Sequence, residues 1–239
     1  MNTLHLALAL LGSYLVGSLS FAVIVSRGMG LADPRSYGSK NPGATNVLRS
    51  GNRAAAVLTL AFDALKGYLP VLLVLLMGPR YGLGPTAAAF AGLAAFLGHL
   101  WPVFFRFQGG KGVATAAGAL LAINPLLGAA TLLTWAIIAA FSRYSSLASI
   151  VAAVFAPFYQ ALIWGIDGSL LPLAVMCLLL IWRHEGNIHK LLAGTEAKLG
   201  QKAAAPLRPS AVKNRPHPHH LTHGPGKTVG QGKHKKGHH

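Results

Sequence analysis

Acidic residues are scarce in this sequence, and charge of either sign is low. Only 5 of the 239 residues are Asp or Glu, and charged residues make up 11% of the chain against 53% hydrophobic residues. Soluble domains carry roughly 25% charged residues, so an ordinary water-soluble domain is excluded. The composition is typical of an all-α polytopic membrane protein.

Cysteine is nearly absent as well. The single cysteine, Cys177, lies inside an apolar run. One cysteine excludes a disulfide framework and a cysteine-based metal site. The eleven histidines show no spacing that specifies a metal site. We therefore expect neither a metal nor a cofactor.

Long apolar runs predict about seven transmembrane helices. They cover, roughly, residues 3–25, 54–77, 86–101, 113–123, 125–141, 147–164 and 169–183. The fourth run is too short for about 30 Å of hydrocarbon, so it is either a partial span or merges with the fifth through Asn124-Pro125. The first run lacks a basic leader and a cleavage site, which favours a span over a signal peptide.

Basic residues predict the orientation. With seven spans, alternate loops place nearly all Lys and Arg side chains on one side, while the other side receives Arg80. The basic side is the cytoplasmic one, so we expect the N-terminus outside and the C-terminus inside.

The end of the chain is basic and rich in His, Pro and Gly. From Lys198 onward it has nine Lys or Arg residues, no acid, and seven of the eleven histidines. Such a segment cannot bury a core. We assign residues 1–197 to an integral-membrane domain and 198–239 to a disordered cytoplasmic tail, with anionic membrane lipids as its expected partner.

A glycine-lysine stretch lies between two of the apolar runs. Residues 98–115 read GHLWPVFFRFQGGKGVAT, with glycines on both sides of Lys111. Such glycines allow backbone N–H groups to approach an anion, and a helix beginning near Val113 would direct its positive end to the same place. The stretch predicts a phosphate site; the alternative is a flexible turn. A nucleotide-binding P-loop is excluded, because Phe105 and Gly112 stand where it needs a glycine and a Ser or Thr.

The loop after the first run, residues 33–49, is dense in small polar residues and cations. It carries Ser39, Asn41, Gly43, Asn46 and Arg49. A guanidinium beside small polar groups suits a second anion pocket. The alternative is an ordered loop whose side chains cap helices.

Charged residues elsewhere offer further candidates. Asp63 and Lys66 lie one helical turn apart inside the second run, so Lys66 either forms an internal ion pair or faces a substrate. Arg143, in a short inside turn, marks topology or adds a cation to the same face. After the last run, His184 and Asn187 share a helical stripe, and His184 is either an acid–base group or an interfacial residue.

Three of these stretches, in this order, resemble the bacterial acyl-phosphate:glycerol-3-phosphate acyltransferase family (PlsY). They are residues 38–49, residues 98–115, and His184 with Asn187-Ile188 and Gly194-Thr-Glu196. The resemblance implies an inner-membrane enzyme whose active site faces the cytoplasm. Its expected partners are glycerol 3-phosphate and a fatty acyl phosphate, the products are lysophosphatidic acid and phosphate, and the reaction begins phospholipid synthesis.

The resemblance also implies roles for individual residues. It assigns activity to the positions of Ser39, Arg49, His184 and Asn187, glycerol 3-phosphate binding to the glycine-lysine loop, and a structural role to Glu196. Lys190 stands where the family usually has arginine, which keeps the charge but not the bidentate fork. Together with the residue chemistry, this gives catalytic candidates Ser39, Arg49, Lys111, His184 and Asn187, and substrate-binding candidates Asn41, Gly43, Asn46, Lys66, Gly109, Gly110, Gly112, Thr115 and Arg143.

The acyltransferase signature H-x-x-x-x-D does not occur, which argues against a donor bound to coenzyme A or a carrier protein.

Two other classes of protein, a transporter and a membrane anchor, are alternatives to an acyltransferase. A transporter for organic phosphates would favour cations within the spans and an internal repeat; no repeat is found. A membrane anchor that recruits nucleic acid would rest on the tail alone, so we expect no nucleic-acid partner.

Overall fold

The computed structural model describes residues 3–201, and the regular secondary structure of these residues is all helical, with no strand among them. The predicted tail from residue 202 onward lies outside the described residues. The helices are α1 (Thr3–Gly17), α2 (Phe21–Gly28), α3 (Ala44–Leu48), α4 (Arg53–Met77), α5 (Pro85–Leu100), α6 (Val113–Ile123), α7 (Pro125–Ser142), α8 (Ser145–Tyr159), α9 (Leu170–Arg183) and α10 (Glu185–Leu192). Short 3-10 turns follow α4 and α5, and a π-helical turn, Gln160–Trp164, follows α8.

The first apolar run is broken, contrary to the continuous helix expected over residues 3–25. α1 and α2 meet at an angle of 40° across Ser18, Leu19 and Ser20. A break inside an apolar layer frees backbone carbonyls, which need a partner where water is absent. Lys66 of α4 supplies one, because its Nζ donates a hydrogen bond to the Leu19 carbonyl at 2.6 Å.

Each predicted apolar segment is helical, but the segments differ in length. By length and composition, four helices of the described part could cross a membrane, or five if α1 and α2 count as one span. α6 and α9 have 11 and 14 residues. Asn124 separates α6 from α7: its Oδ1 accepts from the N–H groups of Leu126 and Leu127, so the two helices do not merge. The number of crossings and the orientation of the termini stay predictions.

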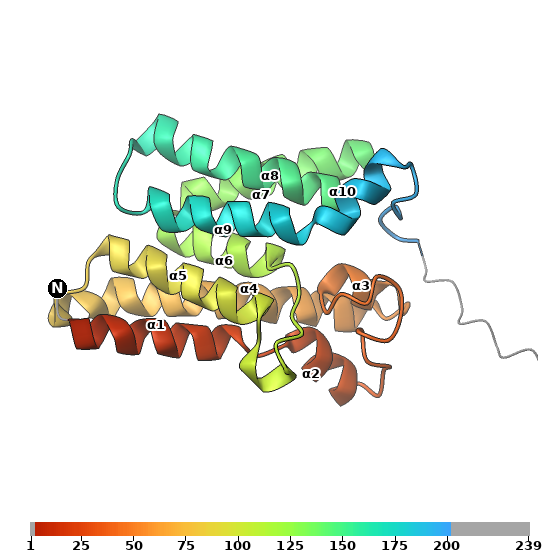
Figure 1. Cartoon of the computed structure of the whole chain (residues 1–239), viewed down its shortest axis with the longest axis horizontal. Helices are drawn as coiled ribbons and strands as arrows, with labels where there is room; N and C mark the ends of the chain where they lie inside the picture. Colours follow the sequence, from red (N-terminus) through yellow and green to blue (C-terminus); the bar gives the residue numbers. More distant parts are fainter. Residues whose placement is uncertain (1–2, 202–239) are drawn as a thin grey trace, which may run out of the picture. The chain divides into compact units, whose positions relative to one another are not determined.

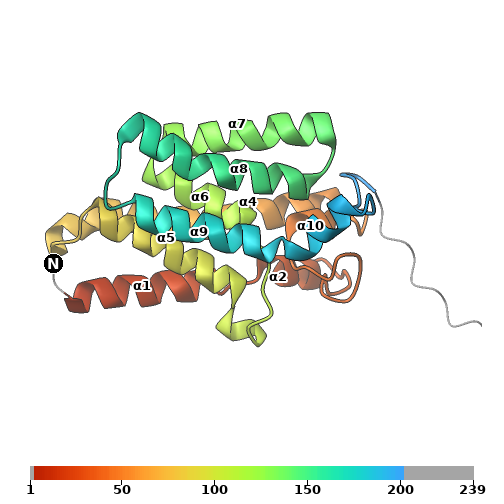
Figure 2. The same ribbon diagram turned by 45° about the horizontal axis from the view of Figure 1, so that its top comes forward.

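The helices lie along one long axis (Figures 1 and 2). In Figure 2, α7 and α8 form one side of the bundle and α1 the opposite side, with α4, α5, α6 and α9 between them. α4 packs against α5 and α6, α1 against α5, and α7 against α8.

Glycine permits two of these close crossings. A Cβ on Gly67 of α4 would lie 2.0 Å from the Thr115 carbonyl oxygen of α6, and one on Gly17 of α1 would lie 2.0 Å from the Ala95 carbonyl oxygen of α5. Small residues let helix backbones approach in this way in membrane proteins. The crossings hold the start of α6 and the end of α5 in place, and the glycine-lysine loop joins these two ends.

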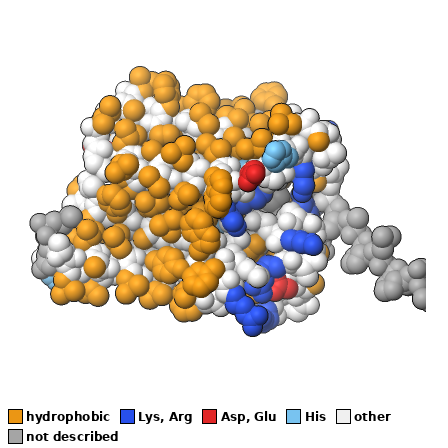
Figure 3. Space-filling view, in the orientation of Figure 1, with side chains coloured by type: hydrophobic (Ala, Val, Ile, Leu, Met, Phe, Trp, Pro, Cys, Tyr) orange, Lys and Arg blue, Asp and Glu red, His pale blue; other side chains and the backbone are white. Residues whose placement is uncertain are grey.

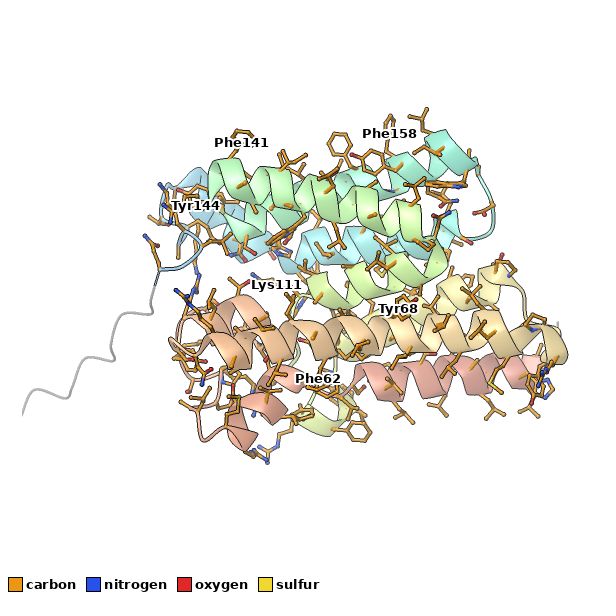
Figure 4. All side chains as sticks on the ribbon, turned by 180° about the vertical axis from the view of Figure 1, so that it is seen from behind. Phe62, Tyr68, Lys111, Phe141, Tyr144 and Phe158 are labelled. Atoms are coloured by element: carbon orange, nitrogen blue, oxygen red, sulfur yellow. The ribbon has the colours of Figure 1, made fainter. Side chains whose placement is uncertain are left out.

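The surface separates into an apolar body and a polar end. Hydrophobic side chains cover most of the face in Figure 3, and Lys and Arg side chains gather at the end formed by α10 and the loop around α3. Phe141 and Phe158 point outward from α7 and α8 in Figure 4, and Phe141 is 88% exposed. Such a band of exposed apolar side chains suits contact with lipid.

Candidate active site

The glycine-lysine loop is held tightly at the polar end of the bundle. Gly109 and Gly110 are buried, and the Arg183 guanidinium donates to both of their carbonyl oxygens, at 3.1 Å for the shortest bond to each. Gly112 adopts the left-handed conformation (φ +81°), and a Cβ there would lie 2.2 Å from the Phe96 ring. α6 begins at the next residue, Val113, as the sequence predicts, so its positive end faces the loop.

Lys111 leaves this loop and joins a chain of polar side chains. Its Nζ donates a hydrogen bond to Asn187 Oδ1. Asn187 Nδ2 donates to Glu196 Oε1 at 2.6 Å, and the Ser146 hydroxyl donates to the same oxygen at 2.7 Å. In Figure 4, Lys111 lies between α4 and the layer of α7 and α8. The carboxylate fixes the amide so that its oxygen faces the lysine.

Lys111 carries a charge at pH 7, but its pKa lies much closer to neutral pH than that of an ordinary lysine. Burial lowers its pKa from 10.5 to about 8. The carboxylate of Glu196 opposes this shift, whereas the positive charges of Lys190, Arg183 and Arg49 add to it. Three other cations are therefore close enough to repel the Lys111 charge, and the Glu196 carboxylate balances that repulsion only partly. An anion with two charges would relieve the repulsion.

His184 lies beside this cluster, at the junction of α9 and α10. Its Nδ1 is 2.8 Å from the Leu180 carbonyl oxygen and must carry the proton, because a carbonyl can only accept. Burial and the Lys111 charge lower the pKa of His184 to about 4. The imidazole is therefore neutral near pH 7, and its Nε2 is free to accept a hydrogen bond from a ligand.

Asn46 organises the polar loop that precedes α3. Its Nδ2 donates to the carbonyls of Pro34 and Tyr37, at 2.7 and 3.2 Å, and its Oδ1 accepts from the Ser39 N–H at 3.0 Å. Asn46 is buried, whereas the Ser39 side chain is exposed. The sequence left open whether these side chains bind an anion or order the loop, and the Asn46 side chain orders the loop. These hydrogen bonds hold Ser39 at the surface.

The remaining loop residues surround this arrangement. Gly43 caps α3 in an extended conformation, and a Cβ there would lie 3.1 Å from Asn41 Nδ2. Arg49 follows the last residue of α3 and is partly buried.

The three predicted motifs meet in space. The Pro42 carbonyl oxygen would lie 2.8 Å from a Cβ on Gly110, so the first loop abuts the glycine loop. Thr45 Oγ1 and Ser145 Oγ are 3.4 Å apart, which joins the first loop to the start of α8. The Lys111–Asn187 hydrogen bond joins the glycine loop to α10. Segments more than a hundred residues apart thus form one site.

Lys66 and Thr115, two further predicted substrate-binding residues, lie inside the helix bundle, where their side chains contact other buried side chains. Lys66 is 3% exposed, and its Nζ is 2.8 Å from Asp63 Oδ1 in addition to its bond to Leu19. This geometry favours the internal ion pair over contact with a substrate. Thr115 is fully buried, with Oγ1 3.3 Å from His99 Nδ1.

Arg143 occupies a different setting. It adopts a left-handed conformation (φ +62°) after the last residue of α7, and its side chain is exposed. Its carbonyl accepts a hydrogen bond from the Leu199 N–H at 2.7 Å, which ties residues after α10 to this turn. Among residues 3–201, no three His, Cys, Asp or Glu side chains converge as metal ligands.

Three contributors were missing from the predicted set. Arg183 enters the sequence argument only as one of the basic residues on the predicted cytoplasmic side, and the sequence predicts no role for Ser146 or His99. For Arg183 a signal existed, because it directly precedes His184. The contact of Ser146 with Glu196 spans 50 residues and leaves no local pattern.

The fold is that of an integral membrane protein, a bundle of apolar helices with a cluster of cationic side chains around a glycine-lysine loop at one end. The family model of glycerol-3-phosphate acyltransferases matches residues 7–194. The chain belongs to this family, as its motifs predict.

Relatives of known sequence and structure agree. A glycerol-3-phosphate acyltransferase of Paraburkholderia phytofirmans is 64% identical over 193 residues, which cover 81% of this chain and 90% of the relative. One of Ralstonia nicotianae is 65% identical over 190 residues, covering 80% and 92%. A crystal structure of PlsY, an integral membrane glycerol 3-phosphate acyltransferase in its glycerol 3-phosphate form, superimposes with a TM-score of 0.76 at 37% identity, covering 82% of this chain and 96% of that one. Its lysophosphatidic acid form gives 0.74 at 36% identity, covering 81% and 95%.

Proposed function

We propose that this protein transfers an acyl group from a fatty acyl phosphate to the 1-hydroxyl of sn-glycerol 3-phosphate. The products are lysophosphatidic acid and inorganic phosphate, at the first step of phospholipid synthesis. The observation that carries the proposal is the meeting of Lys111 with the charges of Arg49, Arg183 and Lys190, at the positive end of α6. Both proposed substrates carry a phosphate, and one carries a chain that the apolar body can accompany.

Lys111 and Arg49 hold the phosphates in this mechanism, with N–H groups of the glycine loop other than that of Gly110, which donates to the His99 carbonyl. The acceptor hydroxyl oxygen bonds to the acyl carbonyl carbon as the bond from that carbon to the phosphate oxygen breaks. The hydroxyl proton passes to the departing phosphate, so atoms and charge balance. Because an acyl phosphate is already activated, the protein contributes mainly position and charge stabilisation.

His184 and Ser39 orient the reacting groups. A pKa of about 4 makes His184 a weak base at neutral pH, so it accepts a hydrogen bond through Nε2 instead of storing the proton. Ser39 lies exposed on its ordered loop and is not expected to form a covalent acyl intermediate, because no Ser–His–acid arrangement surrounds it among residues 3–201. Asn187 and Glu196 set the position of the Lys111 ammonium.

We further propose a bacterial inner-membrane location with seven spans, the N-terminus outside, and the site and C-terminus in the cytoplasm. The gathering of basic side chains at the end that holds the site supports this orientation (Figure 3). In this arrangement α6 and α9 complete the bundle as shorter segments, residues 1–197 are the catalytic domain, and the basic tail meets anionic lipid headgroups.

The decisive experiment compares acyl donors. Purified protein in detergent or lipid mesophase receives glycerol 3-phosphate with palmitoyl phosphate, palmitoyl-coenzyme A or palmitoyl carrier protein, and both products are followed. Turnover with palmitoyl phosphate alone is the expected result. Turnover only with a thioester donor would overturn the donor assignment. If no donor works but glycerol 3-phosphate crosses liposomes, the protein is an organic-phosphate transporter.

A matched pair of variants tests the site. Lys111→Ala removes the ammonium at the loop and should abolish turnover with the protein still folded. Lys198→Ala removes an exposed lysine and should leave turnover unchanged. Full activity of Lys111→Ala would contradict the site.

A further inference from the structure

His99 contacts the glycine loop through both its backbone and its side chain. Its carbonyl oxygen accepts a hydrogen bond from the Gly110 N–H at 3.1 Å. Its imidazole lies directly against the same residue, because a Cβ on Gly110 would be 2.2 Å from Nε2 and 3.1 Å from Cε1. The residue just before Lys111 therefore rests on the edge of a buried ring.

The opposite edge of the ring faces the interior of the bundle. His99 Nδ1 lies 3.7 Å from Asp63 Oδ1 and 3.3 Å from Thr115 Oγ1. Asp63 pairs with Lys66, and Lys66 in turn holds the Leu19 carbonyl in the break between α1 and α2. The side chains of Asp63, Lys66 and His99 are all at least nine-tenths buried.

Buried charges are costly, and a membrane interior tolerates them where they are paired and used. The proposed mechanism uses none of these three side chains as a ligand for substrate. A stabilising role for the ion pair explains Asp63 and Lys66. It leaves unexplained why an imidazole, and not an apolar ring, stands between this pair and the phosphate loop.

We propose that His99 is a positioning residue for the phosphate loop: it anchors on Asp63 and Thr115 through one edge and fixes Gly110 with the other. The position of the Gly110 backbone determines where the Lys111 N–H and ammonium contact the phosphate of glycerol 3-phosphate. The inference rests on the proposed function, because it assigns His99 to that same substrate. It predicts that His99 controls the KM for glycerol 3-phosphate and not the KM for acyl phosphate.

Two amide variants separate the two edges of the ring. An Asn side-chain nitrogen lies as many bonds from Cα as Nδ1, and that of Gln as many as Nε2. His99→Asn therefore keeps the group that faces Asp63 but leaves the space below Gly110 empty, whereas His99→Gln refills that space. We expect His99→Ala to raise the KM for glycerol 3-phosphate about 10-fold or more, since small misplacements of binding groups have such effects.

The unfolding temperature and the KM for glycerol 3-phosphate should then change independently across the three His99 variants. His99→Asn should unfold at a temperature nearer the wild type than His99→Ala does, yet keep the raised KM. His99→Gln should recover more of the KM than of the stability. If the KM and the unfolding temperature move together across the three variants, His99 is a structural residue only and the proposal fails.

A steric pair gives an independent test. Gly110→Ala places a methyl group against the ring, and His99→Ala removes two of its three close contacts, leaving the Pro42 carbonyl at 2.8 Å. The double variant should therefore recover part of the glycerol 3-phosphate affinity lost by Gly110→Ala. Gly109→Ala is the matched control: its methyl would meet backbone oxygens of His99 and Leu100 at 2.1 and 2.4 Å, which His99→Ala does not remove. Equal recovery in both backgrounds, or in neither, would overturn the proposal.

The readouts keep this inference apart from the proposed function. If the wild type turns over glycerol 3-phosphate and acyl phosphate but His99→Ala has an unchanged KM, the inference fails and the function stands. If the wild type shows no turnover, the function fails. Protection of the protein against thermal unfolding by glycerol 3-phosphate then measures the loop contact directly, and equal protection of wild type and His99→Ala would count against the inference.

Discussion

Replacing Lys111 by methionine should make the protein inactive and more stable at the same time. At pH 7 the lysine is charged in the folded and the unfolded chain, but burial lowers its pKa in the folded protein from 10.5 to about 8. At ~1.4 kcal/mol for each pKa unit, holding this charge costs the folded state up to ~3.4 kcal/mol. Methionine has a similar length and carries no charge, so it removes that cost.

The gain is partly offset by the partner that lysine leaves behind. Asn187 Oδ1, which is partly buried, loses its donor, and an acceptor left unsatisfied on burial costs ~1–3 kcal/mol. The net stabilisation is then about 0.4–2.4 kcal/mol, which corresponds to an unfolding temperature higher by roughly 1–10 °C for a chain of this size. Thermal unfolding in detergent measures the shift, and the phosphate-release assay measures the lost turnover.

The pH dependence carries a distinct sign. Because the pKa is lower in the folded chain, the cost of the charge is complete below about pH 8 and disappears as pH rises toward 10.5. The advantage of Lys111→Met over the wild type should therefore shrink across that window, while Lys198→Met, at an exposed position, tracks the wild type throughout. An unfolding temperature below that of the wild type at pH 7, or an advantage that grows above pH 8, would refute the reasoning.

Three further outcomes follow from the site. Gly112→Ala should lower the free energy of unfolding by at least about 2 kcal/mol, because its methyl group would meet the Phe96 ring and the backbone there is left-handed. Gly186→Ala is the control: this glycine lies on a helix with open space around it, so the change should be neutral or stabilising. Thermal unfolding of the two variants measures the difference. Glu196→Gln keeps a side-chain oxygen that can accept from both Ser146 and Asn187, so this variant should retain most of the activity, whereas Glu196→Ala should lose it. An equal loss of activity in the two variants would assign the effect to the charge of Glu196. The value of kcat/KM for glycerol 3-phosphate should fall above about pH 8 as Lys111 loses its proton, and a profile flat to pH 10 would contradict that assignment.

Most of the helices could be predicted from the sequence because their apolar runs are long and clearly bounded. Helix α6 begins at Val113, as the glycines before it predict, and α5 begins within one residue of its predicted start. The break at Ser18 to Ser20 was not predictable, because those residues interrupt the apolar run only weakly. The carbonyl in the break bonds to a lysine of another helix, 47 residues later in the chain, and no local pattern indicates that contact.

The candidate site was predictable in its residue types but not in its connections. Lys111, His184 and Asn187 stand in recognisable motifs, and the structure brings them together. The ambiguity over Lys66 could not be resolved from spacing, since an ion pair and a substrate contact place the same residues one turn apart. Arg183 and Ser146 act through contacts with distant segments, and distance along the chain hides such contacts.

The hydrogen bond from Lys66 to the Leu19 carbonyl also bears on the order of membrane insertion. A ribosome delivers α1 and α2 before α4, so the backbone at the break enters the bilayer before the lysine that satisfies it has been made. Until α4 arrives, the nascent segment can satisfy that carbonyl by straightening into one continuous helix. The bend then forms late in biogenesis, when α4 packs beside α1. The loop that carries Ser39 reaches its place at the same time.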